Sequence, residues 1–95
     1  MDYSNKDFTG RNLTDADPAD FTGQTIHQLC LSQETPDSDV LPLGVTDCTL
    51  LNCNLDNCTI PAGYTVEGGS TRRYAIQEDG MDWLIDANNN PLEPM

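Results

Sequence analysis

Apolar residues recur every five positions between Leu43 and Ala62. This segment reads as four units, LGVTD, CTLLN, CNLDN and CTIPA, whose first and third residues are apolar. An amphipathic helix would place apolar residues three and four positions apart, and a half-buried strand would alternate them with polar residues. A period of five fits neither element, so the segment predicts a repeat architecture. The third residues of the units are Val45, Leu50, Leu55 and Ile60.

In physical terms, each unit can form one side of a coil with four short sides. The third residue and the residue two before it then point inward, and they are buried only when a neighbouring coil stacks on them. These units resemble the pentapeptide-repeat family, whose usual unit is a small residue, Asp or Asn, Leu or Phe, and two polar residues. The resemblance implies a right-handed quadrilateral β-helix, so we expect an all-β protein built as a short solenoid of this type.

A weaker copy of the repeat runs from Met1 to Leu31. It contains KDFTG, RNLTD, ADFTG and QTIHQ, and the residues ADP interrupt it after the second unit. Lys6, Arg11 and Gln24 stand where the family has a small inward residue. We expect an open edge from which these side chains extend into solvent; a loosely coiled block is the alternative. The expected inward residues are Phe8, Leu13, Phe21, Ile26 and Leu31.

The remaining segments divide the chain into two parts. A solenoid is expected over 1–62, with a polar loop at 32–42 that bulges between two coils. In 63–95, TRRYAIQ and MDWLID flank EDG, which predicts a β-hairpin with its turn near Asp79 and Gly80. This hairpin would cover the apolar end of the solenoid. The final ANNNPLEPM contains two prolines and predicts an extended tail.

Size and charge restrict the possible functions. A chain of 95 residues forms one small domain with a marginal core. Its 16 acidic and four basic residues give a net charge of −12, which repels nucleic acid and anionic membranes. No stretch is apolar and long enough to span a bilayer, and the charged N-terminus does not have the pattern of a signal peptide. These features favour the cytoplasm.

The cysteines are spaced for packing rather than for metal binding. Cys48, Cys53 and Cys58 are five apart, whereas structural zinc sites use closer pairs. We expect their thiols to be buried as small apolar groups, with a disulfide or a metal site as the alternative. Cys30 is expected to be the exposed thiol.

No residue pattern predicts catalysis. His27 is the only histidine and is expected at the surface, since no nucleophile motif surrounds it. Asp86, Asn88 and Asn90 have the spacing of the first ligands of a calcium loop, but Pro91 replaces the expected glycine, so a polar turn is predicted. We therefore expect no enzyme activity, no cofactor and no metal site.

Candidate partner-binding residues lie in the C-terminal part. The aromatic side chains supply apolar bulk, and the paired arginines can bind a carboxylate of a partner or pair with the protein's own acidic residues. The tail can lie along a partner. The candidates are Arg72, Arg73, Tyr74, Trp83, Asn88, Pro91, Leu92 and Pro94.

Two functions follow from these observations. The first is a non-enzymatic structural or interaction protein, which we expect to be a homo-oligomer that docks on an assembled shell. A virus (phage) capsid decoration or cement protein bound to a capsid protein fits this description, because attachment would also stabilise so short a fold. With this function we expect the protein at the capsid surface of the virion, and otherwise in the cytoplasm. The alternative comes from the family resemblance, since some pentapeptide-repeat proteins mimic DNA and bind a topoisomerase. The short, interrupted repeat disfavours this alternative.

Overall fold

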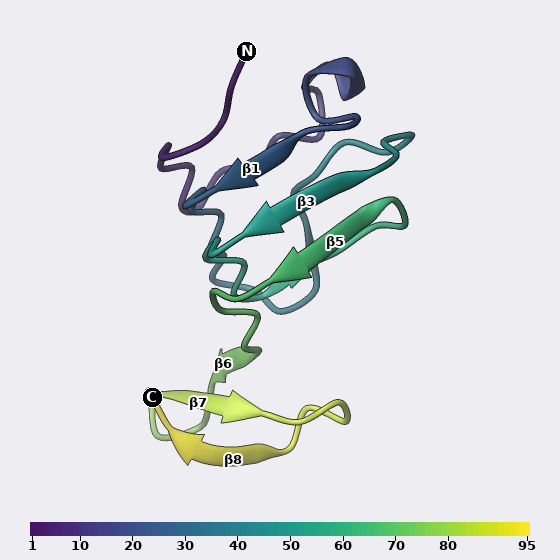
Figure 1. Ribbon diagram of the computed structural model, residues 1–95. Helices are drawn as coiled ribbons and strands as arrows, with labels where there is room; N and C mark the ends of the chain where they lie inside the picture. Colours follow the sequence, from purple (N-terminus) through teal and green to yellow (C-terminus); the bar gives the residue numbers. More distant parts are fainter.

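The computed structural model describes residues 1–95 and shows an all-β protein (Figure 1). A single turn of 3-10 helix, η1 (Pro18–Asp20), is its only helical element, and no helix is long and apolar enough to cross a membrane. The strands are β1 (Thr25–His27), β2 (Ser38–Asp39), β3 (Cys48–Leu51), β4 (Cys58–Thr59), β5 (Tyr64–Glu67), β6 (Tyr74–Ile76), β7 (Asp82–Ile85) and β8 (Pro91–Pro94).

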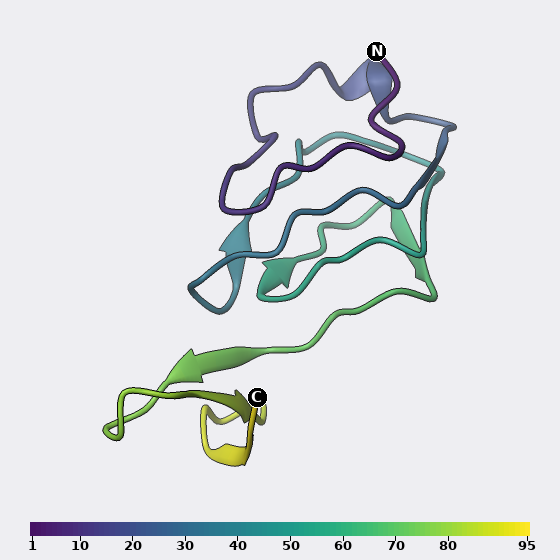
Figure 2. The same ribbon diagram turned by 90° about the vertical axis from the view of Figure 1, so that its left-hand side faces the viewer.

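Two parallel sheets run through the N-terminal two thirds of the chain. One has the order β1-β3-β5, and its register places Leu50 between Ile26 and Val66. The other pairs β2 with β4, so that Ser38 lies opposite Cys58. Parallel neighbours require the chain to return to the same side before each new strand. Figure 2 shows the resulting stack of chain segments.

A third ladder consists of single parallel bridges. These bridges join Asp7 to Cys30, Cys30 to Asn54, and Asn54 to Ser70. The chain therefore contributes once to this ladder at each of four successive levels, which we define as residues 1–23, 24–46, 47–62 and 63–73. Backbone hydrogen bonds join each level to the next, including Leu13 N–H to the Val40 carbonyl oxygen at 2.7 Å and Leu55 N–H to the Ser70 carbonyl oxygen at 2.8 Å.

Left-handed backbone conformations mark turns of the third level. Asp47, Asn52 and Asn57 have φ angles of 55°, 54° and 64°. Asn and Asp adopt this region more readily than other residues with a side chain, because their short polar groups bond locally. These three residues are five apart, so the backbone of this level repeats the spacing that the apolar side chains predict.

The core lies inside the first three levels. Most of the expected inward residues are buried, which confirms the predicted pattern: Leu13, Phe21, Ile26, Leu31, Val45, Leu50 and Leu55. Phe8 and Ile60 are half-buried and pack against this core. At the first level, Tyr3 stacks on Phe21 with ring centroids 4.9 Å apart. Aromatic side chains therefore fill the end of the core that lies near the N-terminus.

The three long polar side chains that were expected to extend into solvent at the first two levels do so. Lys6, Arg11 and Gln24 are all exposed. The Arg11 guanidinium carbon lies 4.8 Å from the centre of the Phe8 ring, so this side chain crosses the face of a half-buried aromatic residue instead of entering the core.

One prediction for the second level is wrong, and another holds only for the residues before β2. Leu43 was expected inward but is 74% exposed. It precedes Gly44, which has a φ of 81°, and the five-residue register begins only after this turn. The segment 32–42 was expected to be a loop, yet it contains β2, and Val40 and Leu41 are buried. The hydrogen bond from Leu13 to Val40 and the pairing with β4 draw its second half into the stack.

The C-terminal part forms a three-stranded antiparallel sheet beyond the fourth level (Figure 1). The predicted hairpin is confirmed, because β6 pairs with β7 and Gly80 N–H bonds the Gln77 carbonyl oxygen at 2.9 Å. The predicted tail is wrong for its last residues, since β8 pairs with β7. Ile85 is the only buried residue after Asn57 and lies outside the core cluster. The expected apolar cap is therefore absent, and the sheet meets the stack through polar contacts.

Candidate interaction surfaces

Arg73 connects the second level to the C-terminal sheet. Its Nε and one terminal nitrogen donate to the two carboxylate oxygens of Asp37 at 3.0 and 2.8 Å. It also donates to the Asp86 carbonyl oxygen and to Asn89 Oδ1. The hydrogen bond from Arg73 lowers the pKa of Asp37, and the same contact raises the pKa of Arg73. This fork geometry suits arginine and fixes the orientation of the sheet.

Asp56 provides a second connection at the junction. Its carboxylate is buried, with a relative exposure of 4% for the residue, and accepts hydrogen bonds from the Ser70 hydroxyl and from Arg72 N–H, the latter at 2.9 Å. The Arg72 guanidinium lies 3.7 Å from the other carboxylate oxygen. A buried carboxylate needs such partners to offset its lost hydration. Asp56 therefore holds the chain where it leaves the fourth level.

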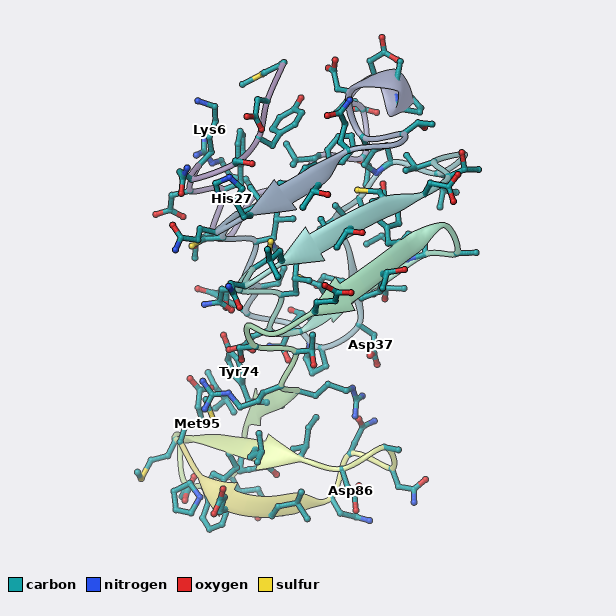
Figure 3. The ribbon with its side chains drawn as sticks, viewed as in Figure 1. Lys6, His27, Asp37, Tyr74, Asp86 and Met95 are labelled. Carbon is teal, nitrogen blue, oxygen red and sulfur yellow. The ribbon has the colours of Figure 1, made fainter.

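Asn57 and Tyr74 complete the junction. Asn57 is buried, and its amide oxygen accepts the Tyr74 N–H at 2.8 Å while its amide nitrogen donates to the Gln33 carbonyl oxygen at 2.8 Å. The Tyr74 hydroxyl lies 3.1 Å from Ser32 Oγ and donates to the Gln33 carbonyl oxygen at 3.1 Å. Figure 3 shows Tyr74 between the stack and the C-terminal sheet. Three of the predicted partner-binding residues, namely Arg72, Arg73 and Tyr74, thus contact the protein itself.

The other predicted partner-binding residues lie together on the C-terminal sheet. Trp83 is half-buried, stands in register with Ala75 and Pro94, and donates its ring N–H to Asp79 Oδ2 at 3.0 Å. Asn88 is exposed in the turn before β8, and Pro91, Leu92 and Pro94 are exposed on β8 itself. This part of the set remains available for contact with another molecule.

Exposed apolar side chains are concentrated on this sheet. Four of the six large hydrophobic residues that are exposed in the protein lie in its strands or directly beside them: Ile76, Met81, Leu92 and Met95. Figure 3 shows Met95 at the opposite end of the sheet from Asp86. The sheet itself is small and has a single buried side chain, so its strands gain little from their own packing.

The turn between β7 and β8 is polar, as predicted. The Asp86 carboxylate accepts the N–H groups of Asn88 and Asn90 at 2.8 and 2.9 Å, and the Asn90 bond is the main cause of its lowered pKa. Asn89 adopts the left-handed region with φ 65°. No group of three or more His, Cys, Asp or Glu residues in the protein could hold a metal ion. Asp86 therefore stabilises a turn in this structure.

Two of the cysteines are buried in the core, as the spacing predicts. Cys48 and Cys53 are each 1% exposed, whereas Cys58 and Cys30 are half-buried. Burial raises the pKa of Cys48 to about 11 and that of Cys58 to about 12, because the thiolate loses hydration. Cys30 is less exposed than expected, since its backbone bridges to both adjacent levels. His27 is exposed at the end of β1, as predicted.

A groove of about 480 Å³ lies along one side of the first three levels. Its walls come from the segments 14–18, 39–43 and 59–61, and they combine three prolines with Ala16, Val40, Leu41 and Leu43. The five-residue period did not predict this groove. The available signal was the interruption ADP, because residues that break a repeat must leave its regular outline.

Comparison of the chain with models of known protein families, with curated proteins and with solved structures finds no match. The candidate surfaces therefore rest on the geometry described above.

Proposed function

We propose that this protein is a short right-handed quadrilateral β-helix of the pentapeptide-repeat type, in which the four levels are its coils. Three observations support this fold: the parallel ladders, the burial of residues spaced by five, and the left-handed turns at Asp47, Asn52 and Asn57. In this arrangement side chains fill the interior. The surfaces that meet other molecules are therefore the outer faces and the ends of this rod-shaped protein.

On this fold we infer a non-enzymatic structural function, in which the C-terminal sheet docks on a larger assembly. The observation that carries this proposal is the exposure of Ile76, Met81, Leu92 and Met95 on a sheet with one buried residue. Covering these side chains would remove apolar surface from water and stabilise a sheet that its own packing holds weakly. The polar junction at Asp56, Asn57 and Arg73 holds the sheet in a fixed orientation on the stack.

The assembly that we propose is a virus capsid, with the protein bound at the surface of the virion as a decoration or cement protein. A rod with extents of 43 × 24 × 23 Å is small enough to lie between capsid subunits. Its partners would be the capsid protein and further copies of itself. A net charge of −12 would keep the free protein soluble and apart from packaged nucleic acid.

Mimicry of DNA is the alternative, and charge density argues against it. Duplex DNA carries one negative charge per ~1.7 Å of axis, or about 25 charges over the 43 Å length of this rod. The net charge of −12 is about half of that value, and it is shared with a C-terminal sheet that does not continue the ladders. To reach the length and charge of a DNA segment that a topoisomerase binds, two copies of the protein would have to associate end to end.

The proposal is tested by sedimentation of the purified protein with empty capsid shells from the same source. We expect the protein to sediment with the shells, and a Leu92→Ser/Ile76→Ser variant to stay in the supernatant while keeping its unfolding midpoint. Gln24→Ser shortens an exposed side chain of the stack that lines neither the C-terminal sheet nor the groove, and it serves as the control. If the protein instead stays free of shells and binds a topoisomerase in competition with duplex DNA, mimicry replaces the structural function.

A further inference from the structure

The groove of 480 Å³ arises from a mismatch between the first two levels. Two of the backbone hydrogen bonds between these levels flank the groove, from Leu13 to Val40 at 2.7 Å and from Gly23 to Thr46 at 3.0 Å. Between these bonds the first level uses the segment 14–22 and the second only 41–45. The longer segment therefore bulges outward and includes η1, which Figure 1 shows at the outside of the stack. Four residues of this longer segment, Thr14, Asp15, Ala16 and Pro18, line the groove.

The floor of the groove is apolar and partly belongs to the core. Val40, Leu41 and Pro42 are buried, while Leu43 projects beside them with 74% of its surface exposed. An isolated exposed leucine is ordinary, but this one borders a concave apolar surface that could enclose a side chain.

The rim of the groove is acidic and lacks any basic residue. Asp15 and Asp39 both line it, and neither forms an ion pair or a side-chain hydrogen bond. The four basic side chains of the protein all lie outside the lining. Two unpaired carboxylates beside an apolar floor are complementary to an apolar side chain flanked by lysine or arginine.

We propose that this groove binds a short segment of a partner protein in which a leucine-like side chain is flanked by basic residues. The apolar side chain would contact Leu41 and Leu43, and the flanking cations would pair with Asp15 and Asp39. This inference rests on the proposed docking function and assigns it a second contact surface, distinct from the C-terminal sheet. The segment 91–95 of another copy fits less well, because Glu93 would approach the two carboxylates.

The test uses two labelled peptides, GKPLPKG and GKPSPKG, which have the same charge and differ in the apolar side chain. Fluorescence anisotropy should show that the unaltered protein binds the leucine peptide more tightly. Leu43→Ser and the pair Asp15→Asn/Asp39→Asn should each weaken this binding about tenfold. Because these residues are exposed, the unfolding midpoint should not change.

Glu78→Gln/Asp82→Asn is the matched control, since it removes the same charge from the C-terminal sheet. Equal binding of the two peptides, equal loss in this control, or no binding at all would overturn the proposal. A dimer that forms with rising concentration and is abolished by Leu43→Ser would assign the groove to a second copy instead. If the protein binds shells but not the leucine peptide, the groove proposal is rejected and the docking function stands. If it binds the peptide but not the shells, the docking function is rejected and the groove remains a peptide-binding site.

Discussion

The amide oxygen of Asn57 accepts a hydrogen bond from the backbone N–H of Tyr74 at 2.8 Å, across the boundary between the stack and the C-terminal sheet. The same side chain bonds Gln33, and its own backbone holds φ at 64°. One residue therefore shapes a turn of the third level, contacts the second level and positions β6.

Asn57→Ala should lower the free energy of unfolding by about 2 to 4 kcal/mol, because it strains a left-handed backbone and leaves the half-buried Tyr74 N–H unpaired, while the Gln33 carbonyl keeps the Tyr74 hydroxyl as a donor. Asn57→Gly keeps the backbone conformation and loses only the amide, so its cost should be intermediate. Urea unfolding of both variants measures the difference. Equal stability of the glycine variant and the unaltered protein would show that the amide bonds contribute nothing.

Neighbouring leucines of β3 should differ sharply in their tolerance of substitution. Leu50 is fully buried and Leu51 half-buried, since successive residues of a strand face opposite sides. Leu50→Ala should cost about 2 to 5 kcal/mol and Leu51→Ala under about 1 kcal/mol, measured by thermal unfolding. Leu50→Asp should leave no native protein. A soluble, cooperatively folded Leu50→Asp variant would contradict the inward orientation of this residue.

Alkaline pH should destabilise the protein through its buried thiols. Folding raises the pKa of Cys48 from 9.0 to about 11, so the native state holds its proton more tightly than the unfolded chain. The associated stability is complete below pH 9, is lost as pH rises through 11, and amounts to about 3 kcal/mol for this group. Unfolding midpoints recorded from pH 7 to 11 should fall above pH 9. The decline should be shallower in Cys48→Ala, and an identical slope would remove Cys48 as a cause.

Removal of residues 88–95 should loosen the C-terminal sheet without unfolding the core. The truncation deletes β8 and leaves β6 and β7 as an isolated pair, which is marginal in water. The core cluster lies entirely in the first three levels, so its unfolding midpoint should be nearly unchanged. Amide hydrogen exchange should show lost protection at Trp83 and Leu84 with retained protection at Leu50. Loss of protection throughout the chain would mean that the sheet supports the core.

Much of the architecture could be predicted because the five-residue period is carried by side chains and backbone together. Val45, Leu50 and Leu55 are buried, and the hairpin turn near Gly80 forms as expected. The same period wrongly predicted that Leu43 is buried. A period does not define where the repeat starts, and the turn at Gly44 lies between this leucine and the repeat. Leu29 is also buried, as expected for the residue two before Leu31.

The site was harder to predict than the fold. Arg72 and Arg73 were predicted to bind a carboxylate, either of a partner or of the protein itself. The carboxylates that they contact, Asp56 and Asp37, belong to earlier levels. Spacing along the chain does not predict which residues of different levels come close together. The pairing of the C-terminal residues with β7 could not be predicted either, because their prolines disfavour a strand. The turn at Asp86 is what brings them back against β7.

The prolines of β8 also affect how the free protein behaves at high concentration. Two of the four residues of this outermost strand, Pro91 and Pro94, have no N–H group to donate. A strand of another molecule that approached this edge would find too few donors for a continuous ladder, and Glu93 of each chain would repel the other. The protein can thus expose an apolar sheet at its end and still resist growth into cross-β fibrils.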